Sequence, residues 1–160
     1  MSMFDSSDYR WRETYFVLFD AQRRPAAAKI KAALKKLGGR FELGEIRADD
    51  QGEFESITLS SASDYAALDI SYLTGEEVQL QAAELAKELR GCAVDEVERA
   101  KVALLRGCDA RFDVMHFEQV GDNGDAADEM FDPSALLLVV AALAELTGGV
   151  GVDPQSGTLV

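Results

Sequence analysis

The chain has 160 residues, of which 48% are hydrophobic and three are prolines, a composition typical of one globular domain that excludes a disordered or fibrous chain. Sixteen lysines and arginines stand against 29 aspartates and glutamates, so the formal net charge is −13 and the isoelectric point is near 4.4. This charge opposes general binding to nucleic acid or anionic lipid, and we expect neither as a partner.

No segment indicates export or insertion into a membrane. The longest apolar run, residues 135–144, has ten residues, about half of the ~20 that a membrane-spanning helix needs. The N-terminal residues lack the basic region and the apolar stretch of a secretory signal. We therefore expect a cytoplasmic protein.

The first part of the chain predicts an arm, a strand and a helix. Residues 1–12 lack periodicity and are expected to form a flexible N-terminal arm, followed by a single α+β domain over residues 13–160. The apolar run 14–19 is typical of a central strand with both faces covered. Pro25 then opens a helix that ends at the glycine pair 38–39.

Three more strands are predicted before the next helix. Apolar residues in segments 41–46 and 54–59, separated by the polar turn 49–52, fit a hairpin. Strict alternation over residues 66–72 indicates a further strand with one solvent-facing side. The sheet should therefore contain an antiparallel section.

Two helices follow this strand. Thr74 and Glu77 have the spacing of a capping box, which predicts a helix from about Glu76. Gly91 interrupts that helix, and a second one is predicted over about residues 94–106. The residues of the second helix expected to face inward are Val97, Ala100 and Leu104.

The last part of the chain predicts a strand, a buried helix and a hairpin. Residues 112–117 are apolar on both faces, so this strand should lie inside the sheet. Asp132 and Pro133 fit the start of a helix that is apolar almost all round until Glu145, so we expect it to be sandwiched. Residues 150–160 have the pattern of a terminal hairpin.

The order of the predicted elements is β α β β β α α β α β β. This order mixes hairpins with few helical crossovers, and so favours an α+β fold over a doubly wound parallel sheet. We expect a mixed, mainly antiparallel sheet with about four helices packed against it.

The single histidine limits the catalytic chemistry. His116 excludes sites that need two imidazoles. Glu118 shares its strand face, whereas Asp113 points to the other side, so His116 and Glu118 are the candidates for a catalytic site. The preferred interpretation of His116 is structural. Cys92 and Cys108 are expected to be reduced, structural thiols.

Neither a metal nor a cofactor is expected. The acidic loop 121–129 offers Asp122, Asp125, Asp128 and Glu129 as candidate metal ligands, but their spacing misses that of an EF-hand, so a solvated loop is preferred. The glycine-rich segment 148–151 follows a helix and enters a strand, which is the reverse of a phosphate-binding loop.

The most distinctive charge feature is a basic island in the first predicted helix and its flanks. Its seven candidate binding residues, with no acid between residues 21 and 41, are Arg23, Arg24, Lys29, Lys31, Lys35, Lys36 and Arg40. Removing these seven positive charges from a net charge of −13 leaves −20 for the rest of the chain. A solvated helix face explains this pattern, and docking onto an acidic surface, including self-association, is the alternative.

These observations favour an interaction or accessory domain without catalytic activity, whose partner is another protein or a second copy. One alternative is an acidic inhibitor or immunity-type protein that covers a basic enzyme surface, which predicts a single dense acidic face. A second alternative is an enzyme with an unfamiliar site near His116, which predicts a cleft at that residue.

Overall fold

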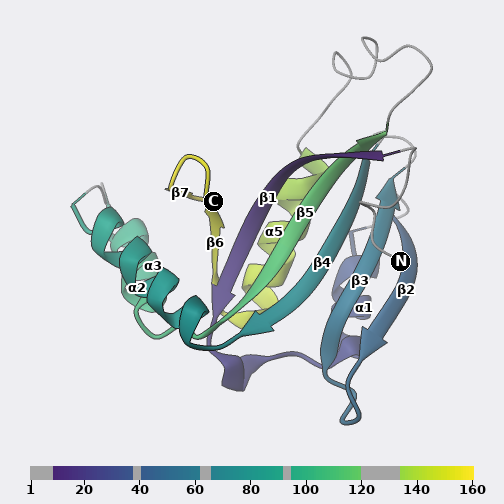
Figure 1. Cartoon of the computed structure of the whole chain (residues 1–160), viewed down its shortest axis with the longest axis horizontal. Coiled ribbons are helices and arrows are strands. Elements are labelled where there is room, and N and C mark those ends of the chain that lie inside the picture. Colours follow the sequence, from purple (N-terminus) through teal and green to yellow (C-terminus); the bar gives the residue numbers. More distant parts are fainter. Residues whose placement is uncertain (1–8, 38–40, 62–65, 92–94, 120–133) are drawn as a thin grey trace.

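The computed structural model describes residues 9–37, 41–61, 66–91, 95–119 and 134–160. These residues form strands and helices in the order that the sequence predicts, with one short 3-10 helix added after the first strand (Figure 1). The α+β class, with helices packed against a mainly antiparallel sheet, is therefore confirmed.

Seven of the described strands form one sheet. They are β1 (Tyr9–Phe19), β2 (Glu42–Ala48), β3 (Phe54–Ser61), β4 (Ala66–Thr74), β5 (Ala110–Gln119), β6 (Val150–Asp153) and β7 (Thr158–Leu159). Their order across the sheet is β2-β3-β4-β5-β1-β6-β7, and every pair of neighbours is antiparallel. The two predicted central strands, β1 and β5, lie next to each other inside this sheet.

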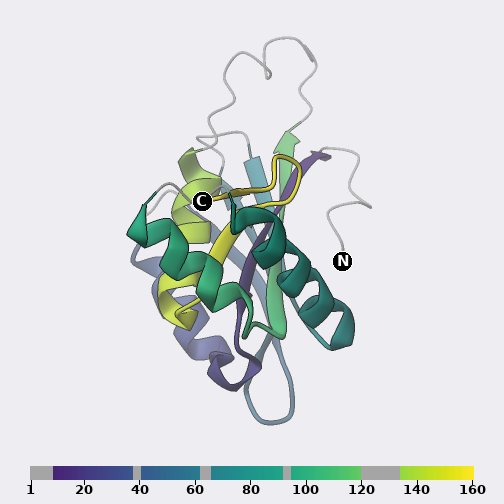
Figure 2. The ribbon, with the colours of Figure 1, turned by 90° about the vertical axis from the view of Figure 1, so that its left-hand side faces the viewer.

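The helices divide between the two faces of the sheet. They are the 3-10 helix η2 (Ala21–Arg23) and the α-helices α1 (Ala27–Lys35), α2 (Glu76–Leu89), α3 (Glu96–Leu105) and α5 (Ser134–Thr147). Helices α1 and α5 lie behind the sheet in Figure 1. Helices α2 and α3 form a pair on the other face, and Figure 2 shows them in front of the sheet.

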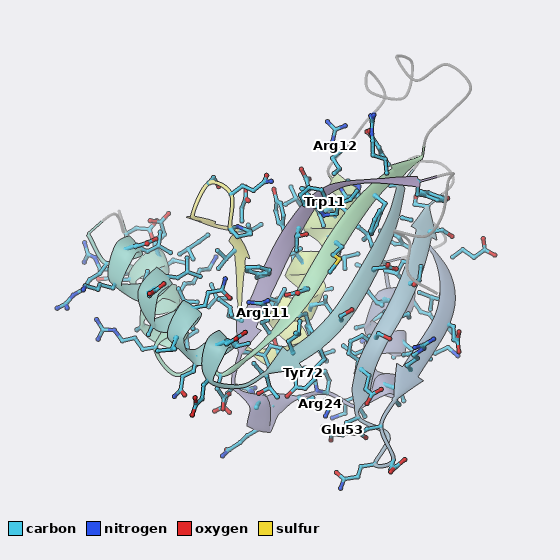
Figure 3. The ribbon with its side chains drawn as sticks, viewed as in Figure 1. Trp11, Arg12, Arg24, Glu53, Tyr72 and Arg111 are labelled. Carbon is cyan, nitrogen blue, oxygen red and sulfur yellow. The ribbon has the colours of Figure 1, made fainter. Side chains whose placement is uncertain are left out.

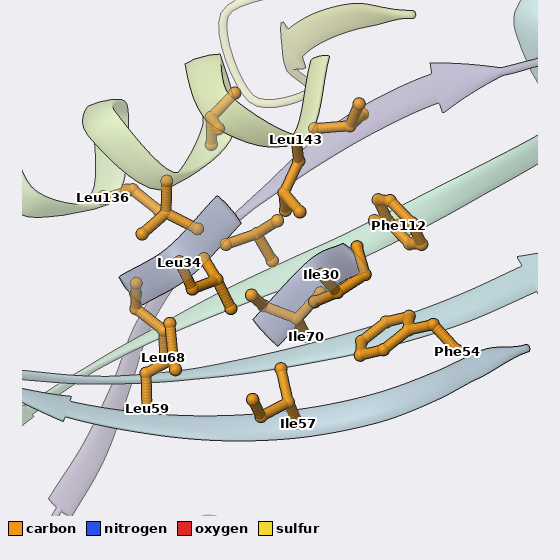
Figure 4. Close-up of a cluster of buried hydrophobic side chains, with 14 of the residues drawn as sticks. Ile30, Leu34, Phe54, Ile57, Leu59, Leu68, Ile70, Phe112, Leu136 and Leu143 are labelled. Carbon is orange, nitrogen blue, oxygen red and sulfur yellow. The ribbon is translucent and has the colours of Figure 1, made fainter. Parts of the chain in front are cut away.

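Alternation along the strands builds a large core under α1 and α5. Side chains of β1, β3, β4 and β5 that point to this face contact Ile30 and Leu34 of α1 and Leu136 and Leu143 of α5 (Figure 4). Phe112 of β5 packs against Phe54 of β3 within this core, and the two rings meet edge to face with centroids 5.4 Å apart. This core fixes α1 against α5.

A smaller core lies under α2 and α3. Leu18 of β1 and Val150 of β6 point to this face and pack against apolar residues of both helices. Beyond these strands, the same face of β2, β3 and β4 carries polar side chains, and it forms a shallow depression lined by residues that include Ser56, Thr58 and Asp69. An antiparallel sheet can present such a face to water.

Two predictions about the starts of elements need correction. Strand β1 begins at Tyr9, so the last four residues of the expected arm are strand. Helix α2 does begin at Glu76, but its N-cap is Gly75 with φ of 136° and without a side-chain cap. The Thr74 hydroxyl instead donates to the Asp109 carbonyl oxygen at 2.8 Å, which ties β4 to the start of β5.

Helix α5 is not sandwiched by the described residues. It buries Leu136, Val139 and Leu143 against the sheet, whereas Leu137 and Leu138 are 38% and 43% exposed. The sheet and α1 cover only one side of this helix, which therefore carries apolar residues on its outer surface. In the part of the chain that the structure describes, no helix has the length and apolar character needed to cross a membrane.

Candidate interaction surface

The six described cations of the basic island differ in their surroundings. Arg24 is a structural residue, because its side chain is only 17% exposed and its guanidinium donates twice to the Phe54 carbonyl oxygen, at 3.0 and 2.7 Å. The same group pairs with Asp49 at 3.1 Å and lies beside Tyr72 (Figure 3). Arg24 is therefore used inside the fold and is unsuited to partner binding.

Arg23 is also set apart from α1. The guanidinium of Arg23 lies against Gly148, so close that a Cβ at this glycine would come within 2.7 Å of Nη1. Gly148 follows the last turn of α5, where a positive charge complements the partial negative charge of the helix end. Arg40 lies outside the described residues.

The remaining four cations are the lysines of α1 and its C-cap, and all four are exposed. Lys29 and Lys36 border a shallow groove between α1 and α5 that has a volume of about 550 Å³. We call it the basic groove, and it is lined by Lys29, Ala32, Ala33, Lys36, Leu37, Ala142, Glu145 and Leu146. Lys31 and Lys35 do not line the groove and lie on the other flank of α1.

The basic groove combines an apolar lining of alanines and leucines with charged rims. Ala32, Ala33 and Ala142 keep the floor shallow, so a helix or a large side chain of a partner could approach closely. The α1 rim carries two positive charges, whereas the α5 rim carries Glu145. Among the described residues, no ion pair involves Lys29 or Lys36. This rim is therefore available to a partner's carboxylates.

The α2–α3 pair exposes apolar residues that the sequence analysis expected to be buried. Val97 and Leu104 of α3 are 65% and 52% exposed, and Ala100 is also exposed. The expectation was wrong because α3 has two apolar stripes. The stripe formed by Val102 and Leu105 is the one that packs against the rest of the protein. In α2, Leu80 is 66% exposed. Its position off the stripe formed by Val78, Ala82 and Ala86 is the sequence signal of this exposure.

His116 and Glu118 belong to a buried polar cluster on the α1–α5 face of the sheet. His116 is completely buried, and its Nδ1 lies 3.5 Å from Oε1 of Glu13. Glu118, 3% exposed, accepts from Nε of Arg10 at 2.6 Å and from Nη1 of Arg12 at 2.5 Å. The cluster therefore ties β1 to β5.

Electrostatics at this cluster favour a neutral imidazole. Burial lowers the pKa of His116, Glu13 and Glu118 oppose that shift, and Arg12 adds to it. His116 lines neither the basic groove nor the polar depression on the sheet. The shared face of His116 and Glu118 is as expected, but their burial gives the enzyme alternative no support.

Asp113 lies on the other face of β5 from His116, in line with the strand alternation. Arg111 donates to it at 2.7 Å, contacts Gln81 of α2, and stacks 4.4 Å from the centroid of the Phe16 ring (Figure 3). Burial raises the pKa of Asp113, and the charge of Arg111 opposes that shift. These contacts attach α2 to the sheet.

Of the remaining candidates for chemistry, the described residues include only Cys108. Cys108 is a free thiol that is 3% exposed, and burial raises its pKa to about 11, so it stays protonated near neutral pH. Cys92 lies outside the described residues, as do the candidate metal ligands Asp122, Asp125, Asp128 and Glu129. Within the residues that the structure describes, no group of acidic, histidine or cysteine side chains could hold a metal ion.

Neither the family models, nor the curated proteins, nor the solved structures searched gave a match to this chain.

Proposed function

We propose that this chain is a non-catalytic interaction domain that binds an acidic protein partner through the basic groove. The observation that carries the proposal is the placement of Lys29 and Lys36 on one rim of an alanine-lined groove, with Glu145 on the other. A partner helix would place its carboxylates toward α1 and its apolar residues on the groove floor.

The chemistry of the groove supports a selective partner. Lysine rims attract acidic proteins in a salt-dependent way, and Glu145 disfavours a partner that is acidic on both sides. The exposed Leu137 and Leu138 extend the apolar surface of α5. With a net charge of −13, a cytoplasmic protein partner fits this proposal better than nucleic acid does.

No specific observation favours the inhibitor alternative. Three described acidic residues lie on β2 and β3 at one edge of the sheet, and six lie on α2 and α3 near the opposite edge. The described residues therefore spread their negative charge instead of gathering it on one face.

A pair of matched variants tests the groove. The groove variant carries Lys29→Glu and Lys36→Glu, and the flank variant carries Lys31→Glu and Lys35→Glu, which gives the same change in charge on the same helix. We expect the wild type and the flank variant to retain a protein from native lysate at about 0.1 M salt, where the Debye length is about 10 Å. The groove variant should lose it.

Retention should also fail at about 1 M salt, where the Debye length is about 3 Å. Equal loss in both variants would show that only net charge matters and would contradict a binding role for the groove. Retention that neither variant changes would place the binding surface elsewhere on the chain.

A further inference from the structure

One face of α2, from its first residue to Glu84, carries exposed acidic side chains with a single leucine among them. We call it the acidic knob, and it consists of Glu76, Glu77, Leu80 and Glu84, all of which are exposed. The opposite side of the helix packs against the protein through Val78, Ala82 and Ala86. Leu80 is therefore not needed for the core, and its 66% exposure leaves it available to a partner.

The knob and the basic groove have matching spacings. Glu77 and Glu84 are seven residues apart on α2, as Lys29 and Lys36 are along α1, and seven residues of helix span about 10.5 Å. Leu80 lies between the two glutamates, just as the alanines of the groove lie between the two lysines. The single leucine of the knob thus has the same place between two charged residues as the alanines of the groove, and the knob charges are opposite in sign to the groove charges.

We infer that the partner of the basic groove is the acidic knob of a second copy of this chain. The inference rests on the proposed function of the groove and names its occupant. In the complex, Leu80 lies on Ala32 and Ala33, and Glu77 and Glu84 pair with the two rim lysines. Glu145, on the opposite rim, keeps the acidic knob toward α1.

The positions of the knob and the groove in the fold determine the symmetry of the assembly. Helices α1 and α5 cover one face of the sheet, and α2 packs on the other, so knob and groove belong to opposite sides of the molecule (Figures 1 and 2). Two copies therefore cannot fill each other's grooves about a twofold axis. The contact is head-to-tail, which builds a ring if the rotation closes and an open chain if it does not.

Sedimentation velocity of the purified full-length chain tests this assembly. At about 0.1 M salt the weight-average mass should rise with protein concentration beyond that of a dimer, and at about 1 M salt it should return to the monomer. A wild-type chain that stays monomeric at every concentration, or that stops at a dimer, would overturn the head-to-tail assembly.

Charge exchange tests which surfaces meet. A groove variant (Lys29→Glu, Lys36→Glu) and a knob variant (Glu77→Lys, Glu84→Lys) should each be monomeric, because like charges then face each other. The chain that carries all four substitutions should associate again, because the charges are exchanged across the contact. The flank variant (Lys31→Glu, Lys35→Glu) should associate as the wild type does, and circular dichroism should show that every variant is folded.

Failure of the four-substitution chain to associate, or loss of association in the flank variant, would overturn the knob-to-groove contact. The proposed function has a separate outcome. If the wild type is monomeric but retains a lysate protein that the groove variant loses, the groove binds another protein and self-association is wrong. If the groove variant still associates and still retains the lysate protein, both proposals fail.

Discussion

The guanidinium of Arg24 lies 4.1 Å from the centroid of the Tyr72 ring while it donates two hydrogen bonds to the carbonyl oxygen of Phe54. Arg24 comes from the segment between η2 and α1, and its partners come from β4 and β3. It also pairs with Asp49 in the turn between β2 and β3. One side chain of the basic island thus holds three parts of the sheet and the approach to α1 together.

Replacing Arg24 should lower the stability of the fold. Arg24→Ala removes a cation–π contact and a paired donor from a largely buried carbonyl oxygen, so we expect the free energy of unfolding to fall by about 2 kcal/mol in urea titrations. Arg24→Lys should restore only part of it, because an ammonium group cannot reproduce the planar fork. The exposed Lys31→Ala, expected within about 0.5 kcal/mol of the wild type, is the control. Equal effects at both positions would contradict this role.

The pH dependence of stability should report His116. Because burial lowers its pKa in the folded state below the ordinary value of 6.5, the unfolded chain binds the proton more tightly between those two values. The free energy of unfolding should therefore fall as pH drops below about 6.5, at up to about 1.4 kcal/mol per pH unit, and level off below the folded-state pKa.

Urea titrations of the wild type and of His116→Gln at several pH values between 5 and 7.5 measure this contribution. The variant should lack the decline below pH 6.5, so its curve should approach that of the wild type as the pH falls. The opposite contribution of Asp113, whose pKa is raised, is common to both proteins and cancels in the difference. Parallel curves over the whole range would contradict a buried neutral histidine.

The sequence allowed the order of the elements to be predicted, because hydrophobic periodicity is a local signal. The buried face of α3 could not be predicted in the same way. This helix has one apolar stripe through Val97 and Leu104 and another through Val102 and Leu105, and the position of α2 and the sheet decides which is buried. The buried face of α3 therefore depends on contacts with residues outside this helix.

The candidate surface was predictable only in part, for the same reason. The sequence shows the lysines of α1 as a cluster of positive charges, and it shows Arg24 as one more member of this cluster. Only the structure reveals that Arg24 contacts Phe54 and Tyr72 inside the fold. The α5 side of the groove includes Ala142 and Leu146. It lies beside α1 because the two helices pack together, and the sequence of α1 alone does not predict this packing.

Adjacent leucines in α3 provide a direct test of its orientation. Leu105 is completely buried, so Leu105→Ala should cost about 2–4 kcal/mol of unfolding free energy through lost burial and a residual cavity. Leu104 is 52% exposed, so Leu104→Ala should cost less than about 1 kcal/mol. Chemical denaturation compares the two variants under identical conditions. The reverse ranking would mean that α3 packs through the stripe that the sequence analysis favoured.

Gly149, which follows the end of α5, lies in close contact with strand β1. A Cβ at this position would lie 2.3 Å from the carbonyl oxygen of Leu18 and 2.9 Å from Cβ of Phe19, so backbone would have to move. Gly149→Ala should therefore lower the free energy of unfolding by about 1–3 kcal/mol, as overpacking does. Thermal and urea denaturation of the variant measure this loss.

Gly91 is the matched control for this substitution. A Cβ at Gly91 would meet nothing within 4 Å, so Gly91→Ala should be neutral or stabilise the protein by about 0.4–1 kcal/mol through the entropy of the unfolded chain. The contrast separates a steric cost at Gly149 from a general effect of removing glycine. If both alanine variants were equally stable, the close contact between Gly149 and Leu18 would not exist in solution, and α5 would sit farther from β1 than the structure places it.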